Sequence, residues 1–236
     1  MAITASMVKE LREMTGAGMM DCKKALTATE GDMDKAVDFL REKGLAGAQK
    51  KAGRIAAEGI VATCISEDEK HAVVVEVNAE TDFVAKNEKF KTYVAEVAAQ
   101  AVNTQAEDIE GFMAEKWALD PSMTVKEKLS SMISIIGENM NIRRFAKVSE
   151  ENGIVVSYIH AGGKIGVLVD VETDVVNDAI KEMAKNVAMQ AAALKPQYTT
   201  RAEVDADYIS REKEILLAQN MIGSPTPTAV NVAKIR

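Results

Sequence analysis

The sequence predicts an α+β protein in which three short helices precede a core of antiparallel sheets and helices. Apolar residues recur at helical spacing through the first 44 residues, and runs rich in β-branched residues follow at 59–65 and 71–77. Further along the chain, strands come in groups that are followed by helices. This grouping favours antiparallel sheets over a parallel, doubly wound fold, in which strands and helices alternate.

The first 44 residues predict a bundle of three short helices. Thr4 is placed to cap the first helix, the glycines of Gly16-Ala17-Gly18 end it, and Gly44 is expected to end the third. Met19 and Met20 follow the glycine turn directly. We expect one of them to face the core and the other to be exposed, where paired methionines suit a partner surface.

Residues 45–58 change character and are interpreted as a basic linker with a possible helical start. Lys50, Lys51 and Arg54 supply three cations close together, and no acidic residue lies between them. A nucleic-acid patch is the alternative, but the cations have no aromatic residues between them. A solvated linker is the favoured interpretation.

The rest of the chain predicts a core of two subdomains and a tail. Thr124 and Glu127 have the spacing of a capping box, and Gly137 is expected to end the helix that they open. Residues 104–122 are interpreted as mainly polar, with Trp117 the only tryptophan of the chain, and predict no element. Subdomain N is predicted at 59–140, with strands 59–65 and 71–77 and a helix from about Glu88. Subdomain C is predicted at 141–200, with strands 141–148, 154–160 and 164–172 and a helix near 176–191. The tail is predicted at 201–236, with a charged helix at 204–220, a break at 223–228 and frayed residues at 229–236.

The corner between strand 71–77 and the helix near Glu88 allows two interpretations. Asp82 could cap a helix while Phe83 fastens it to the core. Alternatively, polar neighbours keep Phe83 in water, where an aromatic beside a carboxylate suits another protein's pocket. Spacing alone favours the first interpretation.

Composition and missing motifs exclude several classes of protein. The 236 residues are 47 % hydrophobic but only 4 % aromatic, and the net charge of −7 argues against general attraction to nucleic acid or membranes. The chain has no apolar run of about 18 residues, no signal-peptide core, no phosphate loop and no metal-ligand spacing. Its two cysteines make no disulfide framework. We therefore expect a cytoplasmic, non-enzymatic protein without cofactor, metal or catalytic residues.

Several segments, in the same order along the chain, resemble those of the elongation factor Ts family, the guanine-nucleotide exchange factors of bacterial and organellar translation. Together they span residues 3 to about 200. The matching segments are 4–12, 15–26, 78–87, 137–144 and 166–168. The resemblance implies a ubiquitin-associated-like N-terminal domain of three helices, followed by an α+β core of two subdomains with antiparallel sheets.

The resemblance also implies a partner, GDP-bound elongation factor Tu, and the residues that contact it. Thr81, Asp82, Phe83 and Val84 would form the exchange wedge, which disturbs the Mg²⁺ and phosphate site of the partner. A second set would touch the partner elsewhere. It comprises Leu11, Met19 and Met20 in the N-terminal domain and His160 in the core.

The end of the chain departs from the family's long form, since residues 221–236 do not resemble its continuation. The tail is therefore expected to be truncated or atypical, and short family members suggest a possible homodimer. The competing functions are a ubiquitin-associated-type adaptor and an RNA-binding module that uses Lys50, Lys51 and Arg54. The adaptor leaves the Asp82-Phe83 corner unexplained, and the acidic chain disfavours the RNA-binding module.

Overall fold

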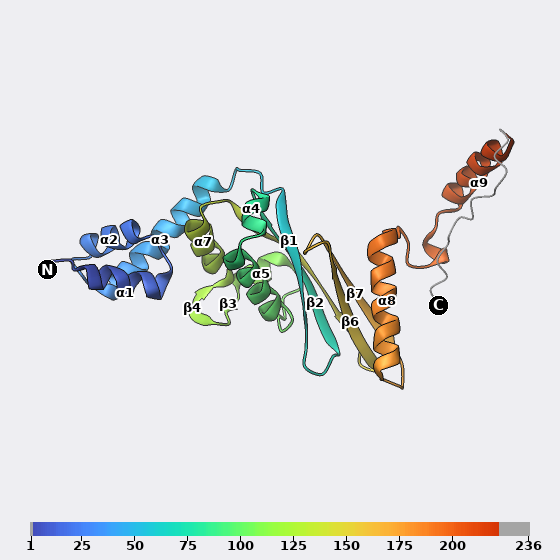
Figure 1. Ribbon diagram of the computed structural model, residues 1–236, viewed down its shortest axis with the longest axis horizontal. Helices are drawn as coiled ribbons and strands as arrows, with labels where there is room; N and C mark the ends of the chain where they lie inside the picture. Colours follow the sequence, from blue (N-terminus) through green and yellow to red (C-terminus); the bar gives the residue numbers. More distant parts are fainter. Residues whose placement is uncertain (1, 222–236) are drawn as a thin grey trace. The chain divides into compact units, whose positions relative to one another are not determined.

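The computed structural model describes residues 2–221, and the chain divides into two compact units, 1–192 and 193–236, which are described separately (Figure 1). The α-helices are α1 (Ala5–Thr15), α2 (Met19–Ala28), α3 (Met33–Lys51), α4 (Asp82–Ala85), α5 (Glu88–Ala101), α6 (Ile109–Ala114), α7 (Val125–Ile136), α8 (Asp178–Leu194) and α9 (Ala206–Met221). The strands are β1 (Glu58–Ile65), β2 (His71–Ala79), β3 (Lys116–Trp117), β4 (Asp120–Thr124), β5 (Met140–Ser149), β6 (Gly153–His160) and β7 (Ile165–Glu172). This composition confirms the predicted α+β class.

The N-terminal helices form with the predicted start and break of α1. The Thr4 hydroxyl accepts a hydrogen bond from the Met7 N–H, and Gly16 ends α1 in the left-handed conformation at φ 68°. The expectation that one of Met19 and Met20 faces the core is wrong. Both are exposed, because the buried face of α2 starts only at Cys22.

The third helix does not end at Gly44 as predicted. It continues to Lys51, so the first seven residues of the expected linker are helical. Gly44 is buried against α7, and a Cβ placed on it would lie 3.5 Å from the Ser134 hydroxyl oxygen. Packing against α7 therefore sustains the helix through a residue that often terminates helices.

The core is built on an antiparallel sheet with strand order β1-β2-β5. The alternate residues Val73, Val75 and Val77 of β2 enter one buried cluster with residues of α5 and α7. The opposite face of the sheet meets the β6–β7 hairpin, where the Val61 N–H donates to the Gly163 carbonyl at 2.7 Å. The sheet is therefore covered on one face by helices and on the other by a second, two-stranded sheet (Figure 1).

Two predictions about the core differ from the structure. The three strands that the sequence places together in subdomain C do not all pair with one another, because β5 pairs with β2 and leaves β6 and β7 as a separate hairpin. Residues 104–122 contain α6 and most of the β3–β4 hairpin, which polar composition concealed. The anchor of this segment is Trp117, which is buried against Tyr93 with a 6.1 Å separation of ring centroids.

The second unit contains a 3-10 turn (Arg201–Glu203) and most of the predicted charged helix, present as α9. The predicted break at 223–228 and the frayed residues 229–236 lie outside the described residues. Between residues 2 and 221, no helix is both long enough and apolar enough to cross a membrane.

Two glycines with opposite surroundings give a test of this packing. We expect Gly44→Ala to raise the free energy of unfolding by about 1 kcal/mol, because a helical glycine is replaced and the new Cβ meets only ordinary contacts. We expect Gly166→Ala to lower it by about 1–3 kcal/mol, since its Cβ would lie 2.9 Å from Val74 Cγ2 and 3.0 Å from Val61 Cγ2. Urea unfolding measures both, and equal effects of the two substitutions would contradict the packing described.

Candidate interaction site at the Thr81–Val84 corner

The corner follows β2 directly and is built around the single turn of α4. Thr81, in extended conformation, is the N-cap, and its hydroxyl oxygen accepts from the Val84 N–H at 3.4 Å. Asp82 is the first residue inside the helix. The interpretation of Asp82 as the cap is therefore wrong by one residue.

Phe83 points away from the core, so the interpretation of this residue as a staple is also wrong. Its side chain is 82 % exposed, whereas Ala85 is buried and Val84 packs half-buried against the main core. A single helical turn can bury only one side of its surface, and here Val84 and Ala85 occupy that side. The large aromatic is left in solvent, on a helix that is anchored from below.

Glu138 fastens the corner to the end of α7. Its two carboxylate oxygens accept from both donors of Thr81, at 3.0 Å from the backbone N and 2.7 Å from the hydroxyl oxygen. Gly137, in the left-handed conformation at φ 91°, ends α7 and turns the chain toward this position. Charge-assisted hydrogen bonds of this kind are stronger than neutral ones, so they fix where α4 begins.

We call the hydrogen bonds between Thr81 and Glu138 the clamp. A second set of contacts extends the clamp to the segment before β1. The Asn139 N–H donates to Glu80 Oε1 at 2.5 Å, and the Asn139 side-chain amide donates to the Arg54 carbonyl at 2.7 Å. The Arg54 guanidinium lies 3.4 Å from Glu80 Oε1. Sequence reasoning assigned no role to Glu80, Glu138 or Asn139, although all three lie within or beside the segments that resemble the family.

An exposed ion pair lies on the outer side of the corner. Lys86 Nζ is 2.7 Å from Asp82 Oδ2, one helical turn away. The hydrogen bond from Lys86 lowers the pKa of Asp82, and the same contact raises the pKa of Lys86. Both groups are solvated, so the pair shapes the charge around Phe83 and adds little to stability.

The remaining predicted contact residues lie on other elements. Met19 and Met20 are exposed at the start of α2, 56 % and 62 % respectively, and Leu11 is fully buried among the N-terminal helices. His160 is exposed at the end of β6, with Nδ1 3.0 Å from the Tyr158 hydroxyl oxygen. Met19 and Met20 therefore lie on a different surface from His160, and Leu11 lies on neither.

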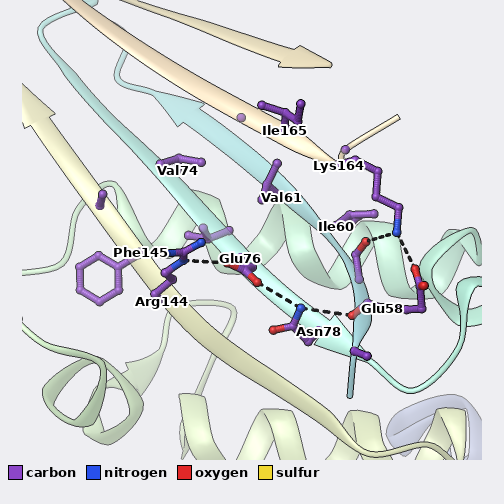
Figure 2. Close-up of a pocket in the computed structure, with 16 residues that line it drawn as sticks. Glu58, Ile60, Val61, Val74, Glu76, Asn78, Arg144, Phe145, Lys164 and Ile165 are labelled. Atoms are coloured by element: carbon purple, nitrogen blue, oxygen red, sulfur yellow. Dashed lines mark hydrogen bonds and ion pairs between the residues drawn. The ribbon is translucent and has the colours of Figure 1, made fainter. Parts of the chain in front are cut away.

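A groove of about 490 Å³ lies between the three-stranded sheet and the start of β7 (Figure 2). Lys164 Nζ is 2.6 Å from Glu58 Oε2, and Arg144 Nε is 2.7 Å from Glu76 Oε2. These opposite charges neutralise one another and offer no net charge to a ligand. Within residues 2–221, no group of three or more His, Cys, Asp or Glu side chains is arranged to hold a metal ion.

Comparison with known proteins places this corner in a family. The sequence profile described as Elongation factor TS matches residues 80–233 and so includes the corner. The chain belongs to the elongation factor Ts family. It is 57 % identical to elongation factor Ts of Clostridium tetani (strain Massachusetts / E88), 56 % to that of Clostridioides difficile (strain 630) and 55 % to that of Clostridium botulinum (strain Alaska E43 / Type E3). Each match extends over 217 residues, which is 92 % of this chain and 71 % of the relative.

Family membership confirms the resemblance to elongation factor Ts. The chain is therefore a translation elongation factor. The region matched by the family profile includes the Thr81–Val84 corner, whereas Met19 and Met20 lie before it. The structure adds how the corner is held, which is by Glu138 and Asn139.

The clamp and the exposed aromatic should respond differently to truncation. We expect Glu138→Ala to lower the free energy of unfolding by about 2 kcal/mol, because two donors of half-buried Thr81 lose a charged acceptor. We expect Phe83→Ala to change it by less than about 0.5 kcal/mol, because the side chain is exposed. Denaturant unfolding measures both, and hydrogen exchange at the Val84 amide should rise only in Glu138→Ala. A large loss of stability in Phe83→Ala would restore the staple interpretation.

Proposed function

We propose that this chain is a guanine-nucleotide exchange factor that binds GDP-loaded elongation factor Tu and promotes GDP release without catalytic chemistry of its own. The observation that carries the proposal is the exposed Phe83 on a corner fixed by Glu138. Membership of the elongation factor Ts family names the partner. An aromatic held in solvent by the fold is suited to act on another protein, and the described residues offer it no partner within the core.

In the proposed mechanism, the Thr81–Val84 corner docks beside the nucleotide site of elongation factor Tu. Phe83 enters an apolar crevice of the partner and shifts the backbone that supports Mg²⁺ and the β-phosphate. Since Mg²⁺ neutralises phosphate charge, loss of its support weakens GDP binding. Asp82, ionised at neutral pH and paired with Lys86, places a polar contact beside the aromatic.

The factor needs only a difference in affinity between two states of its partner. If it binds the nucleotide-poor state more tightly than the GDP-bound state, it lowers GDP affinity by the same factor. The clamp supports this, because a corner already fixed before binding loses little conformational entropy on docking. The energy of inserting Phe83 is then available to deform the partner.

The N-terminal helices would supply affinity through a methionine surface. Met14, Met19 and Met20 are all more than half exposed around the α1–α2 turn, and methionine adapts to an irregular partner surface. Leu11 has no exposed surface, so we now propose that it supports this surface from the core. His160 remains a proposed contact at a further region of the partner.

The competing functions account for less of the structure. An RNA-binding module would use Lys50, Lys51 and Arg54; of these, Arg54 has its guanidinium paired with Glu80 and its backbone carbonyl held by Asn139. An adaptor that used only the three N-terminal helices would have no need for the clamped corner.

The homodimer stays a prediction. Met183 and Met189 of α8 are exposed, and sedimentation at rising protein concentration would test whether two copies of the chain associate.

The central test is release of a fluorescent GDP analogue from elongation factor Tu. We expect the chain to accelerate release, and Phe83→Ala to slow the accelerated rate about 10- to 100-fold, because an aromatic anchor contributes about 2 kcal/mol or more. Lys91→Ala, on the exposed side of α5, is the matched control and should not differ from the unmodified chain. An unchanged GDP off-rate, under conditions where the two proteins bind, would refute the proposed function.

A second test separates affinity from exchange. We expect the double substitution Met19→Ala and Met20→Ala to raise the Kd for elongation factor Tu about tenfold and to leave the exchange rate at saturation nearly unchanged, because the methionines lie outside the corner. Leu11→Ala should act through stability, with a loss of about 2–5 kcal/mol from the buried cluster. A fall in the saturated rate with unchanged Kd would reverse these roles.

A further inference from the structure

Ile55 is a second large apolar side chain held in solvent near the exchange corner. It is 84 % exposed, and Phe83 is 82 % exposed; these are the two highest values among the large hydrophobic side chains that the structure describes. Ile55 lies between α3 and β1, in the segment that the sequence suggested to be a basic linker. Single exposed hydrophobics are common, so exposure alone assigns no role to Ile55.

The strand register brings Ile55 and Phe83 to the same end of the sheet. β1 begins at Glu58, whose Cα is paired with that of Ala79, the last residue of β2. Ile55 precedes this pair by three residues and Phe83 follows it by four. Figure 1 shows the connection from α3 into β1 beside α4 at this end of the sheet.

The same hydrogen-bond network holds both segments. Asn139, buried at 8 % exposure, donates from its side chain to the Arg54 carbonyl at 2.7 Å and from its backbone to Glu80 at 2.5 Å. Ile55 is therefore one residue from a carbonyl fixed by a buried amide. Phe83 is two residues from Thr81, whose backbone N–H and hydroxyl both donate to the half-buried Glu138 carboxylate. A buried polar side chain that immobilises a surface segment restricts where Ile55 can move.

We propose that Ile55 and Phe83 form one apolar contact surface for elongation factor Tu, with Ile55 as a second anchor beside the exchange wedge. This inference rests on the proposed function, since it assigns Ile55 to the partner that Phe83 contacts. The Arg54–Glu80 and Asp82–Lys86 ion pairs lie beside the two side chains. Apolar anchors with paired charges around them have the composition of a protein interface, an apolar centre with a polar rim.

The occupant that fits this surface is an apolar patch of the partner protein. Arg54 and Lys86 each have a carboxylate partner, so neither presents an unpaired positive charge beside the two apolar side chains. Ile55 carries no group that can act on Mg²⁺ or phosphate. Its contribution should therefore appear in affinity and dissociation rate, whereas Phe83 should also govern the rate of GDP release at saturation.

The test is binding of Ile55→Ser to elongation factor Tu–GDP, measured by surface plasmon resonance together with release of fluorescent GDP. We expect the Kd to rise about 3- to 10-fold, mainly through faster dissociation, with the saturated exchange rate unchanged. The unfolding midpoint should not move, because the side chain is exposed. Ile55→Met, which keeps apolar volume, should bind nearly as tightly as the unmodified chain.

Leu119→Ser is the matched control. Leu119 is also a large exposed apolar residue, at 69 %, but it lies in the turn between β3 and β4. The substitution should leave the Kd unchanged. If it weakened binding as much as Ile55→Ser, the effect would reflect general surface polarity, and the inference would be overturned.

The outcomes for the inference and for the proposed function are distinct. If the unmodified chain neither binds elongation factor Tu nor releases GDP, both fall. If it does both, and Phe83→Ala is impaired while Ile55→Ser is not, only the inference on Ile55 falls. If Ile55→Ser weakens binding but the unmodified chain does not accelerate GDP release, the contact surface stands and the exchange function is lost.

Discussion

The rest of the site depends on the pair of hydrogen bonds between Thr81 and the Glu138 carboxylate. Their distances, 3.0 and 2.7 Å, show that both donors of the N-cap residue are satisfied by one side chain. Glu80, next to Thr81, reciprocates by accepting from the backbone of Asn139, next to Glu138. Each of the two loops thus supplies a carboxylate to the other, and neither can shift without breaking bonds in both. This crossed arrangement lets a helix of one turn hold a defined orientation.

The arrangement follows from the topology of the sheet. β2 runs antiparallel to both β1 and β5, and its last residue, Ala79, is paired with Glu58 on one side and with Met140 on the other. Three segments that are distant in sequence therefore meet at one end of the sheet: the start of β1, the exit from β2 and the entry into β5. Val73, Val75 and Val77 of β2 secure this position, because they are buried in one cluster with residues of α5 and α7. Burial of one strand face thus determines which loops lie together at the surface.

Local signals in the sequence predicted local structure well. Thr4, Thr124, Gly16 and Gly137 mark helix ends by chemistry that acts within four residues, and each lies where the pattern indicated. Features set by distant contacts were not predictable in this way. Gly44 continues a helix because α7 packs against it.

The same distinction applies to the candidate site. The exposure of Phe83 and the role of Glu138, 57 residues from Thr81, depend on pairings that no short pattern encodes. The sequence pattern located the corner and left the position of Phe83 open between two interpretations, and only the family resemblance favoured the partner-binding one. The supporting residues of the corner, Glu80, Glu138 and Asn139, were found only in the structure.

The exposure of Phe83 has a consequence for how this position can vary. Because Ala85, Val84 and the Thr81 cap anchor this helical turn, folding places little constraint on the side chain at position 83, whereas the proposed contact with the partner would constrain it. At position 138, folding also constrains the side chain, because Glu138 accepts both hydrogen bonds from Thr81. A library of all substitutions, sorted separately for abundance and for function, should therefore show position 83 tolerant in the first and narrow in the second. Position 83 is also a place where a photoreactive or fluorescent amino acid can be introduced with the scaffold intact.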